Sequence, residues 1–277
     1  GINSFAFFSK SLLVKNTERL QIESDLRHGL AHNEFVLHYQ PQFDVLTQKL
    51  ISAEALIRWN HPRRGLLSPI EFIPYAEDSG LIIPIGEWVL REACEQLNRW
   101  KKAGMAPICI GVNLSPNQFR GADIVKTLTN ILYDTKVDPA MIELELTENL
   151  IINNLDVIDT IHRLKNLGVK ISLDDFGTGN SSLNYLREIP VDRIKIDQSY
   201  IRNISAKRGD EAIIKAIINM AKTLNMTVIA EGVESDHQIE FLKNNACKEI
   251  QGFIYSKPLE AEALEEMMKI PHKEKMP

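Results

Sequence analysis

The fold is indicated most clearly by the stretch Val169-Lys170-Ile171-Ser172-Leu173-Asp174-Asp175. Apolar and polar residues alternate through its first six positions, so in an extended chain the two kinds fall on opposite faces of a strand. A strand that is covered on both sides is normally almost continuously apolar. One face of this strand therefore meets a polar environment, and its two carboxylates come at the C-terminal end.

Short runs of the same kind recur along the chain between amphipathic helices. We expect strands at Phe35–Gln40, Leu50–Arg58, Ile108–Asn113, Ile142–Thr147, Val169–Asp174, Arg193–Asp197, Thr227–Glu231 and Glu249–Phe253. The spacing of apolar residues predicts helices at Thr17–Ala31, Gly86–Ala103, Leu155–Leu167 and Glu211–Leu224. Eight strands that alternate with helices predict an α/β fold, either a βα barrel or a doubly wound sheet.

The composition is that of an ordinary soluble protein, with 277 residues, 44% hydrophobic residues and a net charge of -5. This charge balance gives no basic surface for duplex nucleic acid. The three cysteines have neither metal-ligand spacing nor a disulfide pattern, which favours a reducing cytoplasm. No apolar run approaches the roughly 20 residues of a membrane span, and no signal peptide is visible. We therefore expect no membrane contact by this domain.

The most polar residues of the expected strands gather at the C-terminal ends. The set comprises Glu54, Arg58, Asn113, Glu145, Asp174, Asp175, Lys195, Asp197, Glu231 and Gln251. In a βα barrel these ends meet at one mouth, where active sites lie. Any one of the acids, taken alone, is more often a helix cap or a salt-bridge partner, and Asp197 with Lys195 could be a plain ion pair inside the barrel. As a set, these residues predict a functional site.

Several carboxylates in one site of low dielectric constant repel one another unless a cation neutralises them. No histidine or cysteine accompanies this set, so the ligands are oxygen atoms, which suit Mg²⁺ or Mn²⁺ rather than zinc. The neighbouring carboxylates of Asp174 and Asp175 could serve two metal ions, the arrangement that binds the attacking and leaving oxygens in phosphoryl hydrolysis.

An ordered series of motifs is similar to that of a known family. The motifs are Tyr39-Gln40-Pro41, Glu54-Ala55-Leu56-Ile57-Arg58-Trp59, Asn113-Leu114-Ser115, Glu145-Leu146-Thr147-Glu148, Asp174-Asp175-Phe176-Gly177-Thr178-Gly179, Lys195-Ile196-Asp197, Glu231-Gly232-Val233-Glu234 and Gln251-Gly252-Phe253. They resemble the EAL family of bacterial cyclic di-GMP phosphodiesterases, from about residue 18 to residue 270. The resemblance implies an irregular (β/α)8 TIM-like barrel with one antiparallel strand.

The resemblance also implies roles for individual residues. The implied metal ligands are Glu54, Asn113, Glu145, Asp174, Asp175 and Glu231. The implied catalytic residues are Lys195, which orients the attacking water, Glu231, which acts as general base, and Glu54. The implied substrate-binding residues are Gln40, Leu56, Arg58, Asp197 and Gln251, with Arg58 on a phosphate. Glu148 and Glu234 are implied supporting residues, and Glu148 anchors the loop Asp175–Ser182, which in the family leads to a dimer interface.

The activity that the resemblance implies is metal-dependent hydrolysis of cyclic di-GMP to linear pGpG, which lowers the level of this second messenger. We expect Mg²⁺ or Mn²⁺ at a two-metal site, inhibition by Ca²⁺ and a homodimer through this domain. Two alternatives stay open: a non-catalytic cyclic di-GMP receptor, and a barrel enzyme of the aldolase or enolase kind. The complete ligand set favours the phosphodiesterase. Asn180 stands where the family usually has an aromatic residue, which bears on the loop and not on the metal ligands.

The N-terminal segment has a second resemblance. Residues Gly1–Phe8 resemble the closing strand of a GGDEF cyclase domain. We therefore expect residues 1–16 to be the remnant of a preceding GGDEF-like domain or a linker, and residues 17–277 to form the EAL phosphodiesterase domain. GGDEF or sensory domains are then expected upstream in a longer protein. The expected location is the cytoplasm, which is compatible with a membrane anchor elsewhere in that protein.

Overall fold

Alternating strands and helices make up the computed structural model, which describes residues 10–121, 123–152, 156–177, 185–204 and 208–269. The chain begins with helix α1 (Lys10–Ala31), followed by strands β1 (Phe35–Asp44), β2 (Leu50–His61) and β3 (Gly65–Leu67). The later elements are α2 (Pro69–Asp78), α3 (Ile82–Lys102), β4 (Cys109–Asn113), α4 (Pro116–Gly121), α5 (Ile124–Thr135), η1 (Pro139–Met141), β5 (Ile142–Thr147), α6 (Glu148–Ile152), α7 (Asp156–Asn166), β6 (Lys170–Phe176), η2 (Tyr185–Arg187), β7 (Arg193–Ile196), α8 (Gln198–Arg202), α9 (Arg208–Thr223), β8 (Thr227–Ala230), α10 (Asp236–Asn244), β9 (Glu249–Gln251) and α11 (Ala261–Lys269).

Strand β1 closes the sheet into a barrel, because it pairs with β2 on one side and with β9 on the other. Both pairings are antiparallel, and they place Gln40 opposite Glu54 and Gln42 opposite Gln251. The remaining neighbours, from β9 through β8, β7, β6, β5 and β4 to β2, are parallel. The barrel with one antiparallel strand is confirmed, and the doubly wound sheet is excluded.

The eight predicted strands are present; β5 has the predicted bounds, and the other seven differ from them at one end or both. β1 continues four residues beyond the predicted end at Gln40. The added residues include the polar Gln42, which lies inside the barrel and is 1% exposed. β7 ends one residue early at Ile196, and Asp197 instead caps α8 by accepting a hydrogen bond from the Ser199 N–H. The short β3, which pairs with β2 outside the barrel, was not predicted.

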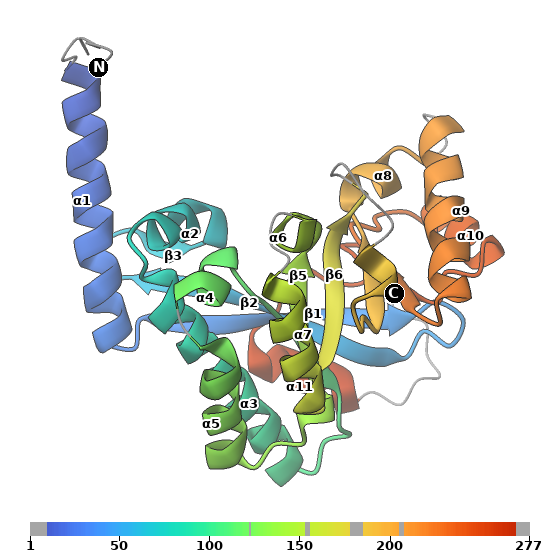
Figure 1. The fold of residues 1–277 in the computed structure, drawn as a ribbon, viewed down its shortest axis with the longest axis horizontal. Helices are drawn as coiled ribbons and strands as arrows, with labels where there is room; N and C mark the ends of the chain where they lie inside the picture. Colours follow the sequence, from blue (N-terminus) through green and yellow to red (C-terminus); the bar gives the residue numbers. More distant parts are fainter. Residues whose placement is uncertain (1–9, 122, 153–155, 178–184, 205–207, 270–277) are drawn as a thin grey trace.

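The helices lie around the outside of the barrel (Figure 1). α3 begins at Ile82, four residues before the predicted start, because Pro84 falls in the first turn, where a missing N–H breaks no helical hydrogen bond. α1 begins seven residues earlier than predicted, at Lys10, and its N-terminal half projects away from the barrel. Its C-terminal half packs on the end of β2, where Asp25 Oδ2 lies 3.2 Å from His61 Nε2, and Asp25 forms an ion pair at 2.8 Å with Arg63 just beyond that strand.

Strand β6 carries an irregularity where its two carboxylates lie. Leu173 pairs with Ile194 and Phe176 with Ile196, so β6 has one residue more than β7 between the two pairs. This is the pattern of a β-bulge, which bends a strand and changes the direction of its side chains. Asp175, within the bulge, has a φ of 54°, in the left-handed region that few residues other than glycine adopt. The bulge gives the two adjacent carboxylates different surroundings.

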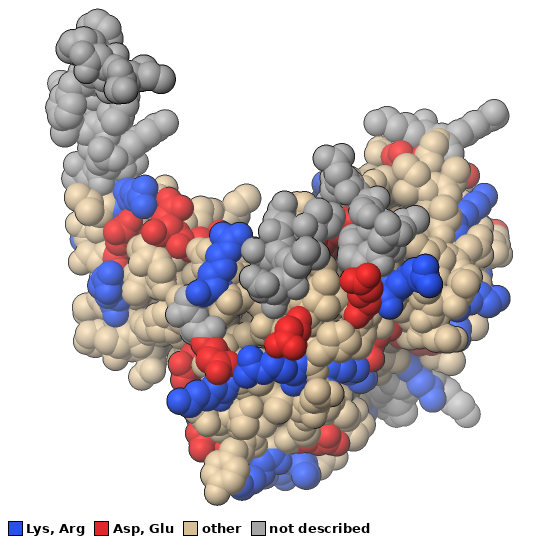
Figure 2. Space-filling view, in the orientation of Figure 1, with Lys and Arg blue, Asp and Glu red and all other residues tan. Residues whose placement is uncertain are grey.

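The outer surface has a mixed character. Figure 2 shows acidic and basic side chains interspersed over the visible face, as the overall charge balance predicts. Among the described residues, no helix has both the length and the apolar character of a transmembrane helix.

Candidate active site

The ammonium group of Lys195 is the centre of a buried cluster at the barrel mouth. Lys195 is 1% exposed, although it is a lysine, and it projects from β7 into the barrel. Its Nζ forms ion pairs with Glu231 Oε1 at 2.8 Å, Asp174 Oδ1 at 3.3 Å and Glu54 Oε2 at 3.7 Å, and a closer one with Glu145 Oε2. The carboxylates come from β2, β5, β6 and the end of β8, so only closure of the barrel brings them together.

Side-chain amides hold the Glu54 carboxylate in place. Asn113 Nδ2 donates to Glu54 Oε1 at 2.7 Å, and Gln251 Nε2 donates to Glu54 Oε2 at 2.6 Å. Gln251 Nε2 also lies 3.1 Å from Gln40 Oε1, which accepts from it. Hydrogen bonds to an ionised carboxylate are stronger than those between neutral groups. These bonds restrict Glu54 to one orientation.

The pKa values of the cluster reflect burial and the proximity of like charges. Burial raises the pKa of Glu231 to about 8, with Asp174 and Glu54 adding to the shift and Lys195 opposing it. Burial and the Glu54 carboxylate raise the pKa of Glu145 well above its usual value. Burial by itself would also raise the pKa of Glu54, but Lys195 and the donor amides have the larger combined effect, and the pKa of Glu54 is lowered. Burial alone would lower the pKa of Lys195, but the surrounding carboxylates raise it.

The chemistry of this cluster fits a divalent cation. If all were ionised, four carboxylates would face one ammonium, which leaves a surplus of negative charge at a buried position. Glu145 Oε1 is buried and has no hydrogen-bond partner, so a donor atom is available to a cation. All the candidate ligands are oxygen atoms, the type that Mg²⁺ and Mn²⁺ prefer. Among the described residues, no three side chains of histidine, cysteine, aspartate or glutamate are arranged so that they could hold a metal ion together. The carboxylates gather instead around Lys195.

The bulge of β6 connects the cluster to Glu148. Burial and the carboxylates of Asp174 and Asp197 raise the pKa of Asp175 to about 6. Next along the chain, the Gly177 N–H donates to Glu148 Oε2 at 3.1 Å, and Glu148 is 1% exposed. The Tyr200 hydroxyl donates to the Gly177 carbonyl. Both bonds hold the backbone that follows the two carboxylates.

The remaining predicted residues are not among the described ion-pair partners of Lys195. Arg58 is half-buried, its Nη1 donates to the Ile57 carbonyl, and burial lowers its pKa. Leu56 is half-buried and Glu234 is exposed. Asp197 serves as the cap of α8, and the ion pairs of the described residues do not join it to Lys195. Asn180 and most of the loop Asp175–Ser182 lie outside the described residues.

Three residues of this region carry no assignment from the sequence. Gly111 lies on β4, and Glu145 Oε1 fills the space that a β-carbon at this position would occupy. The sequence feature that could have identified Gly111 is its place on the same face of the predicted strand as Asn113. Gln42 and Arg193 lie one layer deeper in the barrel. Arg193 precedes Lys195 by two residues on β7, so both side chains point to the interior.

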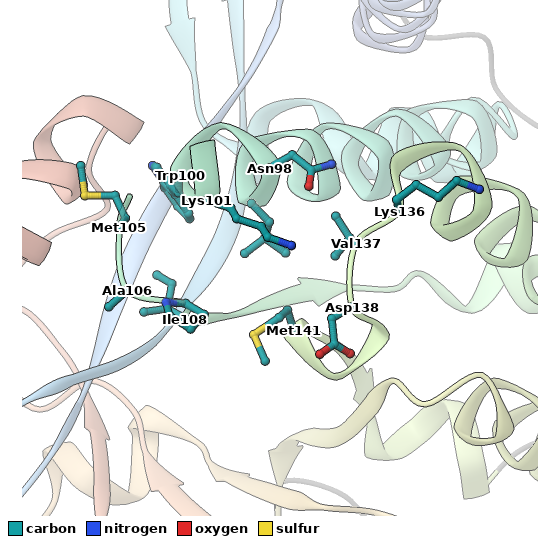
Figure 3. A pocket seen from close by; sticks show the side chains of 12 residues that line it. Asn98, Trp100, Lys101, Met105, Ala106, Ile108, Lys136, Val137, Asp138 and Met141 are labelled. Atoms are coloured by element: carbon teal, nitrogen blue, oxygen red, sulfur yellow. The ribbon is translucent and has the colours of Figure 1, made fainter. Parts of the chain in front are cut away.

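A cavity of about 380 Å³ lies at the other end of the barrel. Its lining residues come from the end of α3 and from the segments that precede β4 and β5, among them Trp100, Met105 and Val137 (Figure 3). The cluster around Lys195 lies at the C-terminal ends of the strands, so this apolar cavity is separate from the candidate active site.

Comparisons with known proteins point to one family. Residues 23–258 match the family model described as EAL domain. The bifunctional diguanylate cyclase/cyclic di-GMP phosphodiesterase MucR of Pseudomonas aeruginosa is 42% identical over 265 residues, which are 95% of this chain and 39% of that protein. The cyclic di-GMP phosphodiesterase PdeR of Escherichia coli is 38% identical over 270 residues, which are 97% of this chain and 40% of that protein. The chain thus spans about two fifths of the length of these curated relatives.

A solved structure agrees with the sequence comparison. The structure described as "PaMucR Phosphodiesterase, c-di-GMP complex" has a TM-score of 0.84 and 43% sequence identity, covering 88% of this chain and 99% of that one. The two chains therefore share one fold over most of the length of this chain.

Proposed function

Because the chain belongs to the EAL domain family, we propose that it is a metal-dependent phosphodiesterase that hydrolyses cyclic di-GMP to linear pGpG and so lowers the level of this second messenger. The observation that carries the proposal is the convergence of four carboxylates on the buried Lys195 at the barrel mouth. The names of MucR and PdeR as cyclic di-GMP phosphodiesterases, and of the MucR structure as a c-di-GMP complex, support the substrate class.

The proposed cofactor is Mg²⁺ or Mn²⁺, with two ions at the site. The proposed ligands are Glu54, Asn113, Glu145, Asp174, Asp175 and Glu231. When bound, such ions lower the pKa of water and stabilise charge on the attacking and leaving oxygens. The oxygen-only donor set, the surplus negative charge and the unpartnered Glu145 Oε1 support this assignment.

The residues of the chain position and activate the water. Lys195 orients the attacking water, and Glu231, whose Oε1 lies 2.8 Å from Lys195 Nζ, accepts its proton as general base. The water oxygen bonds to phosphorus as the bond from phosphorus to the 3′ oxygen breaks, and the proton that Glu231 took from the water is passed on to the leaving 3′ oxygen. The ring thereby opens to pGpG. We assign substrate contacts to Gln40, Leu56, Arg58, Asp197 and Gln251, with Arg58 on a phosphate, and supporting roles to Glu148 and Glu234.

The test is product formation by the purified chain, measured by chromatography with Mg²⁺, with Mn²⁺ and with a chelator. We expect pGpG only in the presence of metal. Glu54→Ala should abolish its formation, whereas Glu240→Ala, which removes an exposed carboxylate on α10, should leave the rate unchanged. Tight binding of cyclic di-GMP without product would instead indicate a receptor, and a fully active Glu54→Ala variant would contradict the metal-ligand assignment.

We also propose a homodimer through this domain and an upstream GGDEF or sensory domain, with residues 1–16 as its remnant or linker and residues 17–277 as the EAL domain. The name of MucR, which includes a diguanylate cyclase, and the greater length of the relatives support the upstream domain. We propose the cytoplasm as the location, which the three free and buried cysteines support.

A further inference from the structure

Beneath the cluster, a chain of buried hydrogen bonds runs from Arg193 to Glu54. Arg193 Nη1 donates to Gln42 Oε1 at 3.0 Å, and Gln42 Nε2 donates to Gln251 Oε1 at 2.7 Å. Gln251 Nε2 then donates to Glu54 Oε2 at 2.6 Å. Gln42 is 1% exposed, Gln251 4% and Arg193 8%. Water therefore has little access to these groups, and each depends on its protein partners.

The direction of the chain follows from hydrogen-bonding chemistry. A guanidinium group has only donors, so the atom of Gln42 that faces Arg193 must be the oxygen. The hydroxyl of Ser52, 2.6 Å away, donates to the same oxygen. The amide nitrogen of Gln42 is thereby directed at Gln251, whose own nitrogen is left for the carboxylate. Glu54, when ionised, can only accept, so both ends of the chain require the same orientation of the two amides.

The lower end of the chain is held in place by ion pairs. Arg193 lies 3.2 Å from Glu143 Oε2 and 3.0 Å from Glu249 Oε2, on β5 and β9. β1 supplies Gln42 at the point where its register with β2 shifts, between Gln42 and Phe43. With Arg193 on β7 and Ser52 on β2, five strands thus hold the guanidinium and the first amide.

We infer that Gln42 and Arg193 are positioning residues that act on Glu54 through Gln251. This inference rests on the proposed function in one respect: it takes Glu54 as a metal ligand. Residues that hold a ligand by a hydrogen bond fix its orientation, and their loss typically lowers metal affinity or activity by roughly 10–100-fold. The side chain of Gln42 bonds to Gln251, Ser52 and Arg193 and not to Glu54, so its effect on Glu54 passes through Gln251.

The probe is Mn²⁺ alone, with free and bound ion distinguished by electron paramagnetic resonance. We expect Gln42→Leu to weaken Mn²⁺ binding by roughly tenfold or more. The matched control is Gln96→Leu, because Gln96 is also buried and also accepts from an arginine, Arg99 Nε at 2.8 Å, but lies on α3 outside the barrel. This control should bind Mn²⁺ as the unmodified chain does. Equal losses in both variants would overturn the inference.

A double-mutant cycle separates positioning from general damage. If Gln42 acts through Gln251, then Gln42→Leu should change Mn²⁺ affinity by less than about twofold in a Gln251→Leu background, because coupled residues are not additive. If the double variant instead shows a loss of Mn²⁺ affinity equal to the product of the losses in the two single variants, the inference is overturned. If Gln42→Leu fails to fold, Arg193→Lys provides the second variant, since it keeps the charge beside Glu143 and Glu249 but removes the guanidinium fork. It should weaken Mn²⁺ binding in the same direction, and unchanged binding would contradict the inference.

Turnover of cyclic di-GMP by the unmodified chain is measured in parallel. Mn²⁺ binding with the expected cycle but without any pGpG would overturn the proposed function and leave the positioning role intact. An unmodified chain that binds no Mn²⁺ would overturn both.

Discussion

The carboxylate of Glu145 occupies the space in which a β-carbon at position 111 would stand, with Oε1 closer than two unbonded atoms can approach. Gly111 lies on β4, next to β5, and it pairs there with Glu143. The missing side chain lets Glu145 point into the barrel beside Lys195. The φ of Gly111 is not in the left-handed region, so its backbone conformation does not call for a glycine. The close approach of the Glu145 side chain does.

Gly111→Ala should displace Glu145 and disturb the whole cluster. Because the contact is with a carboxyl group in a packed interior, we expect a loss of stability of about 1–3 kcal/mol. Mn²⁺ affinity and pGpG formation should fall by roughly tenfold or more, since the displaced group is a proposed ligand. Urea unfolding and metal titration measure the two effects.

The matched control is Gly209→Ala in α9, where a β-carbon meets no atom within 4 Å. Alanine is the better helix former by up to about 1 kcal/mol, so this variant should be neutral or slightly more stable, with unchanged Mn²⁺ binding. A Gly111→Ala variant that matches this control would mean that Glu145 has room to move.

Lys195→Met should destabilise the metal-free chain and abolish turnover. Removing one partner of a buried ion pair typically costs about 3–5 kcal/mol, because the remaining charges are left uncompensated. Mn²⁺ should restore part of this loss, since a cation that binds only the folded state stabilises it. Lys165→Met is the comparison, because the Lys165–Asp192 pair is partly exposed and should contribute about 1 kcal/mol or less. Thermal melting with and without Mn²⁺ tests this, and a metal-free Lys195→Met chain as stable as the unmodified one would contradict it.

Glu231 and Asp175 should each lower the stability of the metal-free chain as the pH rises from 5 to 8. Burial raises the pKa of Glu231 to about 8 and that of Asp175 to about 6, above the values of about 4.3 and 3.9 in an unfolded chain. In this range the folded state binds more protons than the unfolded state, so Glu231 lowers stability by at most about 1.4 kcal/mol per pH unit. Asp175 is exposed, so solvent screening makes its contribution smaller. Glu54 has a lowered pKa and titrates below this window.

Urea unfolding in chelator at several pH values measures the slope, which Glu231→Gln should flatten. A pH slope that Glu231→Gln leaves unchanged would contradict the raised pKa of Glu231.

Ca²⁺ in place of Mg²⁺ should permit binding of cyclic di-GMP and suppress its hydrolysis. Ca²⁺ is larger and accepts six to eight oxygen ligands in a looser geometry, so it binds oxygen donors without holding water at a defined angle. Calorimetry with the dinucleotide should give saturable binding in Ca²⁺, and chromatography should detect little or no pGpG. Hydrolysis in Ca²⁺ as fast as in Mg²⁺ would count against the assigned role of the ions.

Much of the fold could be predicted because burial leaves a periodic pattern. The alternation in Val169–Asp174 identified a strand with a polar face, and the structure places Ser172 of that face inside the barrel, where it is fully buried. The bulge of β6 could not be predicted in the same way. It depends on how β6 pairs with β7, and the left-handed φ of Asp175 accompanies the shift in that pairing.

The sequence by itself determined that eight strands alternate with helices, that strands such as Val169–Asp174 have one polar face, and that carboxylates, two amides and a lysine stand near the strand ends. Periodicity records only the environment of a residue along its own strand. Only the tertiary structure decided that β1 pairs with both β2 and β9, and hence that Gln42 meets Gln251 and Arg193, 209 and 151 residues away. Pairing and register depend on contacts between distant segments, and a shift of one residue would turn each of these side chains to the opposite face of the barrel.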